Sequence, residues 1–99
     1  MKVSINAVHF RTDSKLEDFI NDKLGKMNGL FDGIVGSDVT LKLENSESPE
    51  NKVVEIRLAI RGNDLYARKQ CKTFEEATDQ SIEALKKQLQ KYKDKKRGL

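Results

Sequence analysis

The residues best suited to chemistry in this sequence are the basic side chains that crowd its last fourteen positions. Seven of these fourteen residues are basic and one is acidic, a charge of +6, whereas residues 1–85 hold 12 basic and 15 acidic groups. The net charge of +3 therefore comes wholly from the end of the chain. A basic helix end can be a solvated terminus, but a surface that only had to stay soluble would need no such separation of charge. The pattern favours contacts with nucleic-acid phosphates through Lys86, Lys87, Lys91, Lys93, Lys95, Lys96 and Arg97.

No other group of residues indicates catalysis. His9 is the only histidine, and it has no patterned acid or cysteine beside it, so a structural or exposed role is favoured. Cys71 is the only cysteine; Lys69 and Lys72 lie close enough to lower its pKa, but no base partner is identifiable. Metal-ligand spacings and glycine-rich phosphate loops are absent from the sequence. We therefore expect no enzyme, no cofactor and no metal.

Length and composition bound the class of protein. Ninety-nine residues suffice for one small core, and we expect a single domain over residues 1–99 with a basic, fraying tail at 93–99. No apolar run approaches the roughly 18 to 20 residues that span a bilayer, and the first residues lack the apolar core of a signal peptide. A single cysteine suits a reducing compartment. We expect a cytoplasmic protein without a membrane partner.

The first half of the chain predicts a strand followed by a helix. Apolar and polar residues alternate from residue 3 to 7, with a change of phase near residue 8. Thr12-Asp13-Ser14 is a cluster of N-cap formers that predicts a helix start, and Glu17, three residues after Ser14, has the spacing of a capping box. Glycines at 25, 29 and 33 predict that this helix ends between residues 28 and 33. Its apolar face consists of Leu16, Phe19, Ile20, Leu24, Met27, Leu30 and Phe31.

The second half predicts three strands and a long helix. Alternation marks strands over residues 38–44, 54–61 and 65–71, with a polar loop over 45–51 and a tight turn at 62–64. Thr73 with Glu76 predicts the capped start of a helix that continues to the end of the chain. Its inward stripe consists of Phe74, Ala77, Thr78, Ser81, Ile82, Leu85, Leu89 and Tyr92.

The order of elements predicts an α+β fold. In a β-α-β-β-β-α chain whose strands are apolar on one side, the simplest packing is a four-stranded sheet with two helices packed on one face. The other face is then open to water, where it could bind a partner or be only solvated. It carries Ser4, Lys42, Glu44, Glu55, Arg57 and Arg68.

Both helices also carry the pattern of a known family. The last helix has Phe74, then Ala77-Thr78-Asp79, then residues 85–91 in the order Leu-Lys-Lys-Gln-Leu-Gln-Lys. The first has Leu16, Phe19-Ile20, Lys23-Leu24, Lys26-Met27 and Phe31. In these motifs the sequence resembles the short ribosome hibernation-promoting factors, the ribosome-associated inhibitors related to protein Y and also described as sigma-54 modulation proteins. The resemblance covers nearly the whole chain.

This resemblance implies a binding function without chemistry. Such a protein occupies the decoding channel of the small ribosomal subunit, contacts ribosomal RNA, and excludes messenger and transfer RNA in stationary phase or stress. Short members lack the dimerisation domain of the long form, so we expect a monomer off the ribosome and no small-molecule substrate. The implied RNA-binding residues are Lys23, Lys26, Lys86, Lys87, Lys91, Lys93, Lys95 and Lys96.

A second class of function stays open at this point. The open sheet face or an exposed edge strand could bind another polypeptide, with the lysines serving only solubility. Two other RNA-binding modules fit the residues poorly. The strand over 53–60 has no aromatic residue on which a base could stack, as an RNA-recognition motif requires. A double-stranded RNA domain would place lysines where this chain has Phe74-Glu75-Glu76.

Overall fold

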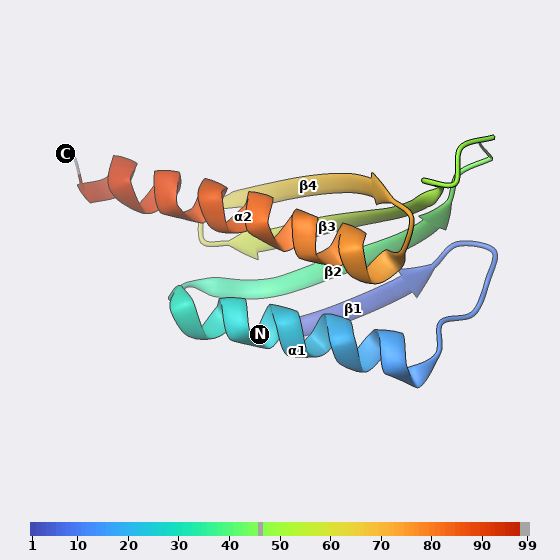
Figure 1. Cartoon of the computed structure of the whole chain (residues 1–99). Helices are drawn as coiled ribbons and strands as arrows, with labels where there is room; N and C mark the ends of the chain where they lie inside the picture. The colour runs from blue at the N-terminus through green and yellow to red at the C-terminus, as the bar shows by residue number, and fades with distance from the viewer. Residues whose placement is uncertain (46, 98–99) are drawn as a thin grey trace.

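The computed structural model describes residues 1–45 and 47–97, with side chains up to residue 94. Six elements follow one another in the predicted order (Figure 1). They are β1 (Lys2–Ala7), α1 (Ser14–Leu30), β2 (Ile34–Leu43), β3 (Lys52–Ile60), β4 (Asn63–Cys71) and α2 (Phe74–Arg97).

The four strands form one mixed sheet in the order β1-β2-β3-β4. β1 pairs with β2 in parallel, and the other two pairings are antiparallel. A parallel pair needs a crossover connection, and α1 is that connection. Figure 1 shows α1 and α2 side by side on the same face of the sheet, which confirms the predicted architecture.

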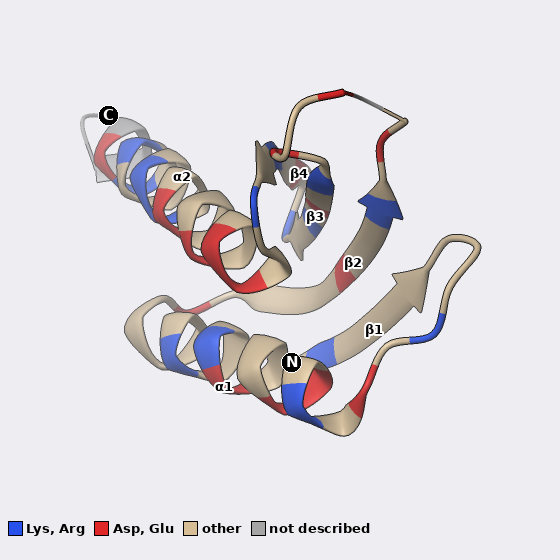
Figure 2. Cartoon of the chain, turned by 45° about the vertical axis from the view of Figure 1, so that its right-hand side comes forward, with Lys and Arg blue, Asp and Glu red and all other residues tan. Residues whose placement is uncertain are grey.

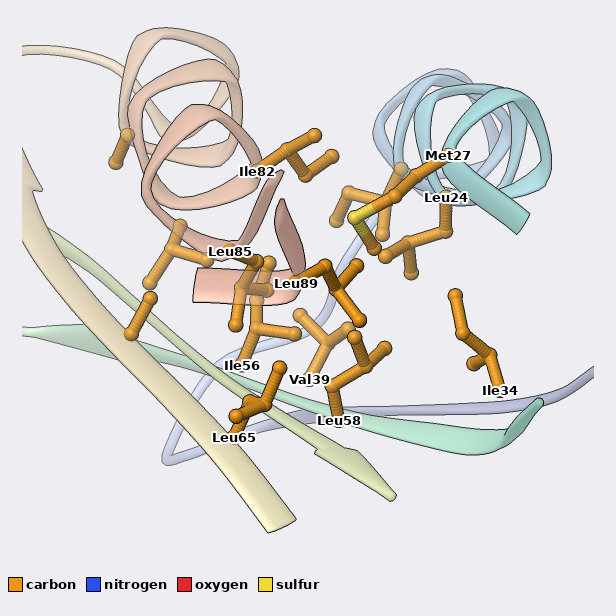
Figure 3. Close-up of a cluster of buried hydrophobic side chains, with 14 of the residues drawn as sticks. Leu24, Met27, Ile34, Val39, Ile56, Leu58, Leu65, Ile82, Leu85 and Leu89 are labelled. Atoms are coloured by element: carbon orange, nitrogen blue, oxygen red, sulfur yellow. The ribbon is translucent and has the colours of Figure 1, made fainter. Parts of the chain in front are cut away.

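The core lies between this face and the two helices. Val39, Ile56 and Leu58 of the sheet are at most 1% exposed, and Leu24 and Met27 of α1 are fully buried. Figure 3 shows these side chains converging with those of α2. The apolar stripe of α2 fills the remaining space, and its deeply buried side chains include Ile82, Leu85 and Leu89. The predicted inward faces of both helices are therefore confirmed except at Leu30, the last residue of α1, which is 62% exposed.

The two helix starts differ in how well the sequence located them. At α2, the backbone N–H of Glu76 donates to Thr73 Oγ1 at 3.1 Å, as predicted. At α1, the cap lies within the predicted cluster of residues 12–14, but the capping box from Ser14 to Glu17 does not form. Asp13 is the N-cap, and its carboxylate accepts a 2.7 Å hydrogen bond from the N–H of Leu16. Glu17 does not close a capping box with Ser14, because its carboxylate is hydrogen-bonded by the hydroxyl of Thr12.

Strand β2 begins at Ile34, four residues before its predicted start. A register shift between Ile34 and Gly36 breaks the alternation that the prediction relied on. Gly36 also lies close to β1, since a Cβ atom there would stand 3.2 Å from the carbonyl oxygen of Lys2. The β3–β4 turn consists of Arg61 and Gly62, the latter at φ 77°, one residue earlier than predicted.

The link between β1 and α1 also touches α2. His9 is exposed and adopts a left-handed conformation at φ 65°, which turns the chain after β1. The ring of Phe10 then stacks on that of Phe74, with centroids 5.3 Å apart and planes 12° apart. The segment before α1 is thereby fixed against the first turn of α2.

Two buried hydroxyl groups, those of Ser37 and Ser81, have no hydrogen-bond partner among the described residues. Thr78 differs, because its hydroxyl donates to the carbonyl oxygen of Phe74 at 2.7 Å. A buried polar group without a partner costs free energy that an apolar side chain would not.

Replacing Ser81 by Ala should therefore stabilise the domain. The substitution removes the unpaired hydroxyl and introduces a better helix former, so we expect the free energy of unfolding to rise by about 1 kcal/mol. Thr78→Val is the matched control: it removes a paired hydroxyl in the same helix and should lower stability by about 1 kcal/mol. Urea unfolding of both variants measures the two changes, and a destabilised Ser81→Ala protein would contradict the assignment.

Candidate nucleic-acid interface

Charge is distributed unevenly along α2. Glu75, Glu76, Asp79 and Glu83 lie in its first half, and its later turns are mostly basic, as Figure 2 shows. This order suits the helix dipole, which favours acids at the start and bases at the end. Figure 1 shows that the end of α2 extends past the sheet, so the basic turns lie at one end of the molecule.

Three of the predicted lysines, two in α1 and one in α2, are held by ion pairs within the protein. Lys23 Nζ lies 3.3 Å from Asp79 Oδ1 of α2. Lys26 pairs with Asp22 one turn away in α1, also at 3.3 Å. Lys86 pairs with Glu83 at 3.3 Å within α2.

Lys93 makes a different contact. Its ammonium group lies over the ring of Phe31, 5.2 Å from the ring centroid, which is within the range of a cation–π interaction. Tyr92, beside it in sequence, is half-buried against the core and donates to the carbonyl oxygen of Arg61 at 3.2 Å. The seam between the two helices is thus closed by packing and compensated charge.

Lys87 and Lys91 lie on the opposite side of α2, toward β4. Together with Lys69 of β4 they line a hollow of about 560 Å³, whose other walls include Ala84 and Gln88. None of these three lysines forms an ion pair among the described residues. The predicted lysines whose side chains are described therefore fall into two groups, those that contact other side chains of the protein and those that line the hollow beside β4.

Lys69 is a functional candidate that the sequence reading missed. Successive residues of β4 point to opposite faces of the sheet, and Lys69 points to the same face as Leu65, Ala67 and Cys71, which are buried under the helices. Lys69 is nevertheless a lysine and remains partly exposed. A lysine at an inward position of an alternating strand has to reach solvent beside the covering helix. That signal was present in the sequence.

Lys95 and Lys96 are the remaining predicted contacts. The backbone of α2 continues through both to Arg97, but their side chains lie outside the described residues, as do residues 98 and 99.

The open face of the sheet carries a lattice of ion pairs. Arg57 is bonded to Asp38 and lies 3.3 Å from Asp64, so that one guanidinium joins three strands. Beside it, Glu55 joins Lys42 at 2.9 Å and Arg68 at 3.4 Å. A further pair at 3.0 Å connects Arg68 to Glu44. These seven side chains, three basic and four acidic, pair with one another and sum to a charge of −1, so the lattice itself offers no excess positive charge to phosphates.

Glu55 is a member of this lattice whose pKa is shifted by its partners. The hydrogen bond from Lys42 lowers the pKa of its carboxyl below the ordinary value of 4.5 and outweighs the opposing effect of burial. Tyr66, which is 53% exposed on the same face, has a raised pKa because of burial of its hydroxyl and its hydrogen bond to Glu55. The lattice is therefore formed with Glu55 ionised and Tyr66 neutral.

The other residues considered for catalysis or metal binding do not form a functional site among the described residues. Cys71 is buried, and burial raises the pKa of its thiol, with Glu76 and Glu50 adding to the effect. The lysines near it in sequence do not activate it. Among the described residues, no three His, Cys, Asp or Glu side chains gather as a metal site would need. Within the same residues, neither helix has the length and apolar character to cross a membrane.

An α+β domain with a basic helix end and a neutralised sheet face defines a class of binding protein, and comparison with known proteins identifies its family. The family model described as sigma 54 modulation protein / S30EA ribosomal protein matches residues 3–97, and the chain belongs to this family. The resemblance found in the sequence is therefore confirmed.

Curated relatives agree with this assignment. A ribosome hibernation promoting factor of Pseudomonas putida is 29% identical over 99 residues, covering 100% of this chain and 93% of the relative. A factor of the same name from Klebsiella oxytoca is 26% identical over 95 residues, 96% of each chain. The family consists of non-enzymatic binding proteins, so the expectation that this chain is not an enzyme is also confirmed.

Solved structures share the fold. A ribosomal subunit interface protein from Coxiella burnetii superposes with a TM-score of 0.84 at 18% identity, over 95% of this chain and 99% of that one. The N-terminal domain of Thermus thermophilus Protein Y gives a TM-score of 0.79 at 17% identity, over 93% and 99% of the two chains. At such identities the likeness concerns the fold alone.

The lattice on the open face predicts a pH dependence of stability. Because the folded-state pKa of Glu55 is lowered, its pairing contributes fully above about 4.5 and is lost as the pH falls through the folded value. Glu55→Gln removes the titrating group, so its free energy of unfolding should fall less on acidification than that of the wild type. Chemical unfolding at a series of pH values measures both slopes.

The control for this experiment is Glu47→Gln in the exposed β2–β3 loop, which should keep the pH dependence of the wild type. Identical slopes for Glu55→Gln and the wild type would mean that the lattice does not contribute through this carboxylate.

Proposed function

We propose that this protein is a ribosome hibernation factor that binds the small ribosomal subunit and inhibits translation in stationary phase or stress. Two observations support the proposal: membership of the family, with relatives named as ribosome hibernation promoting factors, and the segregation of positive charge at the end of α2. The second observation carries the physical argument, because it supplies an affinity for RNA.

The finer part of the proposal is the place of binding. The domain lies in the decoding channel, contacts ribosomal RNA, and blocks messenger and transfer RNA by occupying their space. Its extents of 48 × 25 × 19 Å give an elongated body that a channel could hold. No step of bond making or breaking is involved. The predicted lysines of α1 and α2 remain the proposed contact set, and among those whose side chains the structure describes, Lys87 and Lys91 have no ion-pair partner.

The remaining parts of the proposal follow from this mode of action. Residues 1–99 act as a single ribosome-binding domain in the cytoplasm, monomeric off the ribosome and without a small-molecule substrate. An ammonium group recognises phosphate as a point charge, so we expect binding that depends on RNA shape and charge more than on base sequence.

The competing function is a protein-interaction module on the open sheet face. The observation in its favour is a shallow hollow over Gly36 and Ala59, lined also by Val35, which is 62% exposed. Tyr66 on the same face of the sheet is 53% exposed. Single exposed apolar residues are common on soluble proteins, and the ion pairs around them are already satisfied. The lysine end of α2 is the stronger signal.

The salt dependence of binding tests the main proposal. If about five lysines contact irregular or single-stranded RNA phosphates, the logarithm of the binding constant should fall against the logarithm of salt concentration with a slope of about −3.5. Sedimentation with purified small subunits at several salt concentrations measures the slope. If the protein stays in the soluble fraction at low salt, the proposal is contradicted.

Substitutions on the open sheet face test the competing function. The double variant Val35→Ser, Tyr66→Ala removes its two exposed apolar side chains and leaves every lysine in place. We expect its affinity for small subunits, measured in the same sedimentation assay, to stay within about twofold of the wild type, because surface substitutions of this kind alter stability little. If the wild type instead formed a complex that salt does not weaken, and this variant lost it, the result would favour a protein-interaction module on the open sheet face.

A further inference from the structure

The two flanks of α2 differ in how their positive charge is compensated. On the α1 side, Lys23, Lys26 and Lys86 each lie 3.3 Å from a carboxylate. A phosphate that approached these ammonium groups would have to exchange with a carboxylate already in place. The net gain from such an exchange is small, because one ion pair replaces another.

The β4 flank is not compensated in this way. Lys69, Lys87 and Lys91 converge on the hollow between α2 and β4 without an ion-pair partner among the described residues. Two acids, Asp79 and Glu83, also line the hollow, but each is engaged by a lysine on the other flank, Asp79 by Lys23 and Glu83 by Lys86. On the α1 side three lysines are paired with carboxylates and Lys93 lies over the ring of Phe31, whereas the three lysines of the β4 flank have no ion-pair partner among the described residues.

The shape of this hollow suits a chain of phosphates. Lys87 and Lys91 lie one helical turn apart, about 6 Å along the axis, and Lys69 reaches the hollow from β4. Three ammonium groups arranged along a groove can contact successive phosphates of one strand, as positively charged grooves do for single-stranded nucleic acid.

The edge of β4 is closed to a protein strand at this point. The side-chain amide of Gln88 donates to the carbonyl oxygen of Tyr66 at 2.9 Å. A strand added to this edge would need that carbonyl as an acceptor. Among possible occupants, a polyanion is thus favoured over an extended polypeptide.

From these observations we propose that the hollow between α2 and β4 is the phosphodiester-binding site of this protein, with Lys69, Lys87 and Lys91 as its three contacts. The inference rests on the proposed function and deepens it, because it directs the β4 flank toward the RNA and leaves the α1 side of α2 facing away. Lys69 is thereby added to the contact set, and Lys23, Lys26 and Lys86 become secondary.

Two triple variants with equal loss of charge test the site. The first carries Lys69→Gln, Lys87→Gln and Lys91→Gln, and the second carries Lys23→Gln, Lys26→Gln and Lys86→Gln. We expect the first to make the salt slope of small-subunit binding shallower by about 2, the value for three phosphate contacts, and the second to change it much less. Equal effects, or a larger effect of the second variant, would overturn the proposal, and thermal unfolding of both variants checks that they remain folded.

A second experiment separates this inference from the ribosomal function. A short oligouridylate RNA is titrated into isotopically labelled wild-type protein while NMR chemical shifts are followed. Shifts clustered at residues 69 and 84–91 support the site even if the protein fails to sediment with small subunits, in which case only the ribosomal proposal falls. Shifts confined to the seam between α1 and α2, or no shifts at low salt, would overturn the site even if subunit binding persists.

Discussion

The packing of the α2 stripe on the sheet is the interaction on which the rest of the structure depends. Leu85 and Leu89 are almost fully buried, and each such side chain contributes about 2 kcal/mol through the apolar surface that it removes from water. The stripe continues to Leu89 and Tyr92, well inside the basic part of the helix. Core residues and lysines therefore alternate around the same turns. Burial of the former fixes the rotation of the helix, and so decides which lysines face β4 and which face α1.

The same packing gives the molecule three surfaces with different electrostatic character. The open sheet face is neutralised by its own ion pairs, centred on Arg57 and Glu55. The seam between the helices is neutralised by pairs such as Lys23 with Asp79. Only the β4 flank and the end of α2 are left to act at longer range on a polyanion. Net charge alone, +3 for the chain, describes none of these differences.

Periodicity was sufficient to predict the architecture. The alternation over residues 54–60 and the stripe of α2 gave β3 and the last helix correctly, because a long run of one period has few competing interpretations. The exact residues at which helices begin were harder to predict from the sequence. Asp13 and Ser14 are both good caps, and only the backbone conformation chooses between them. Which lysines are compensated could not be predicted, since Lys23 meets Asp79 only once the two helices pack together. Lys69 could have been found from its inward parity in β4.

The stack of Phe10 on Phe74 has a consequence for how the domain opens. It ties the segment before α1 to the first turn of α2, although the two are far apart in the sequence. Helix ends ordinarily fray one by one, each with its own low free energy of opening. Here the segment before α1 shares a contact with the first turn of α2, so the amide protons of these two stretches should exchange with solvent through one common opening event. The segment before α1 and the start of α2 thus form a single cooperative unit of local unfolding.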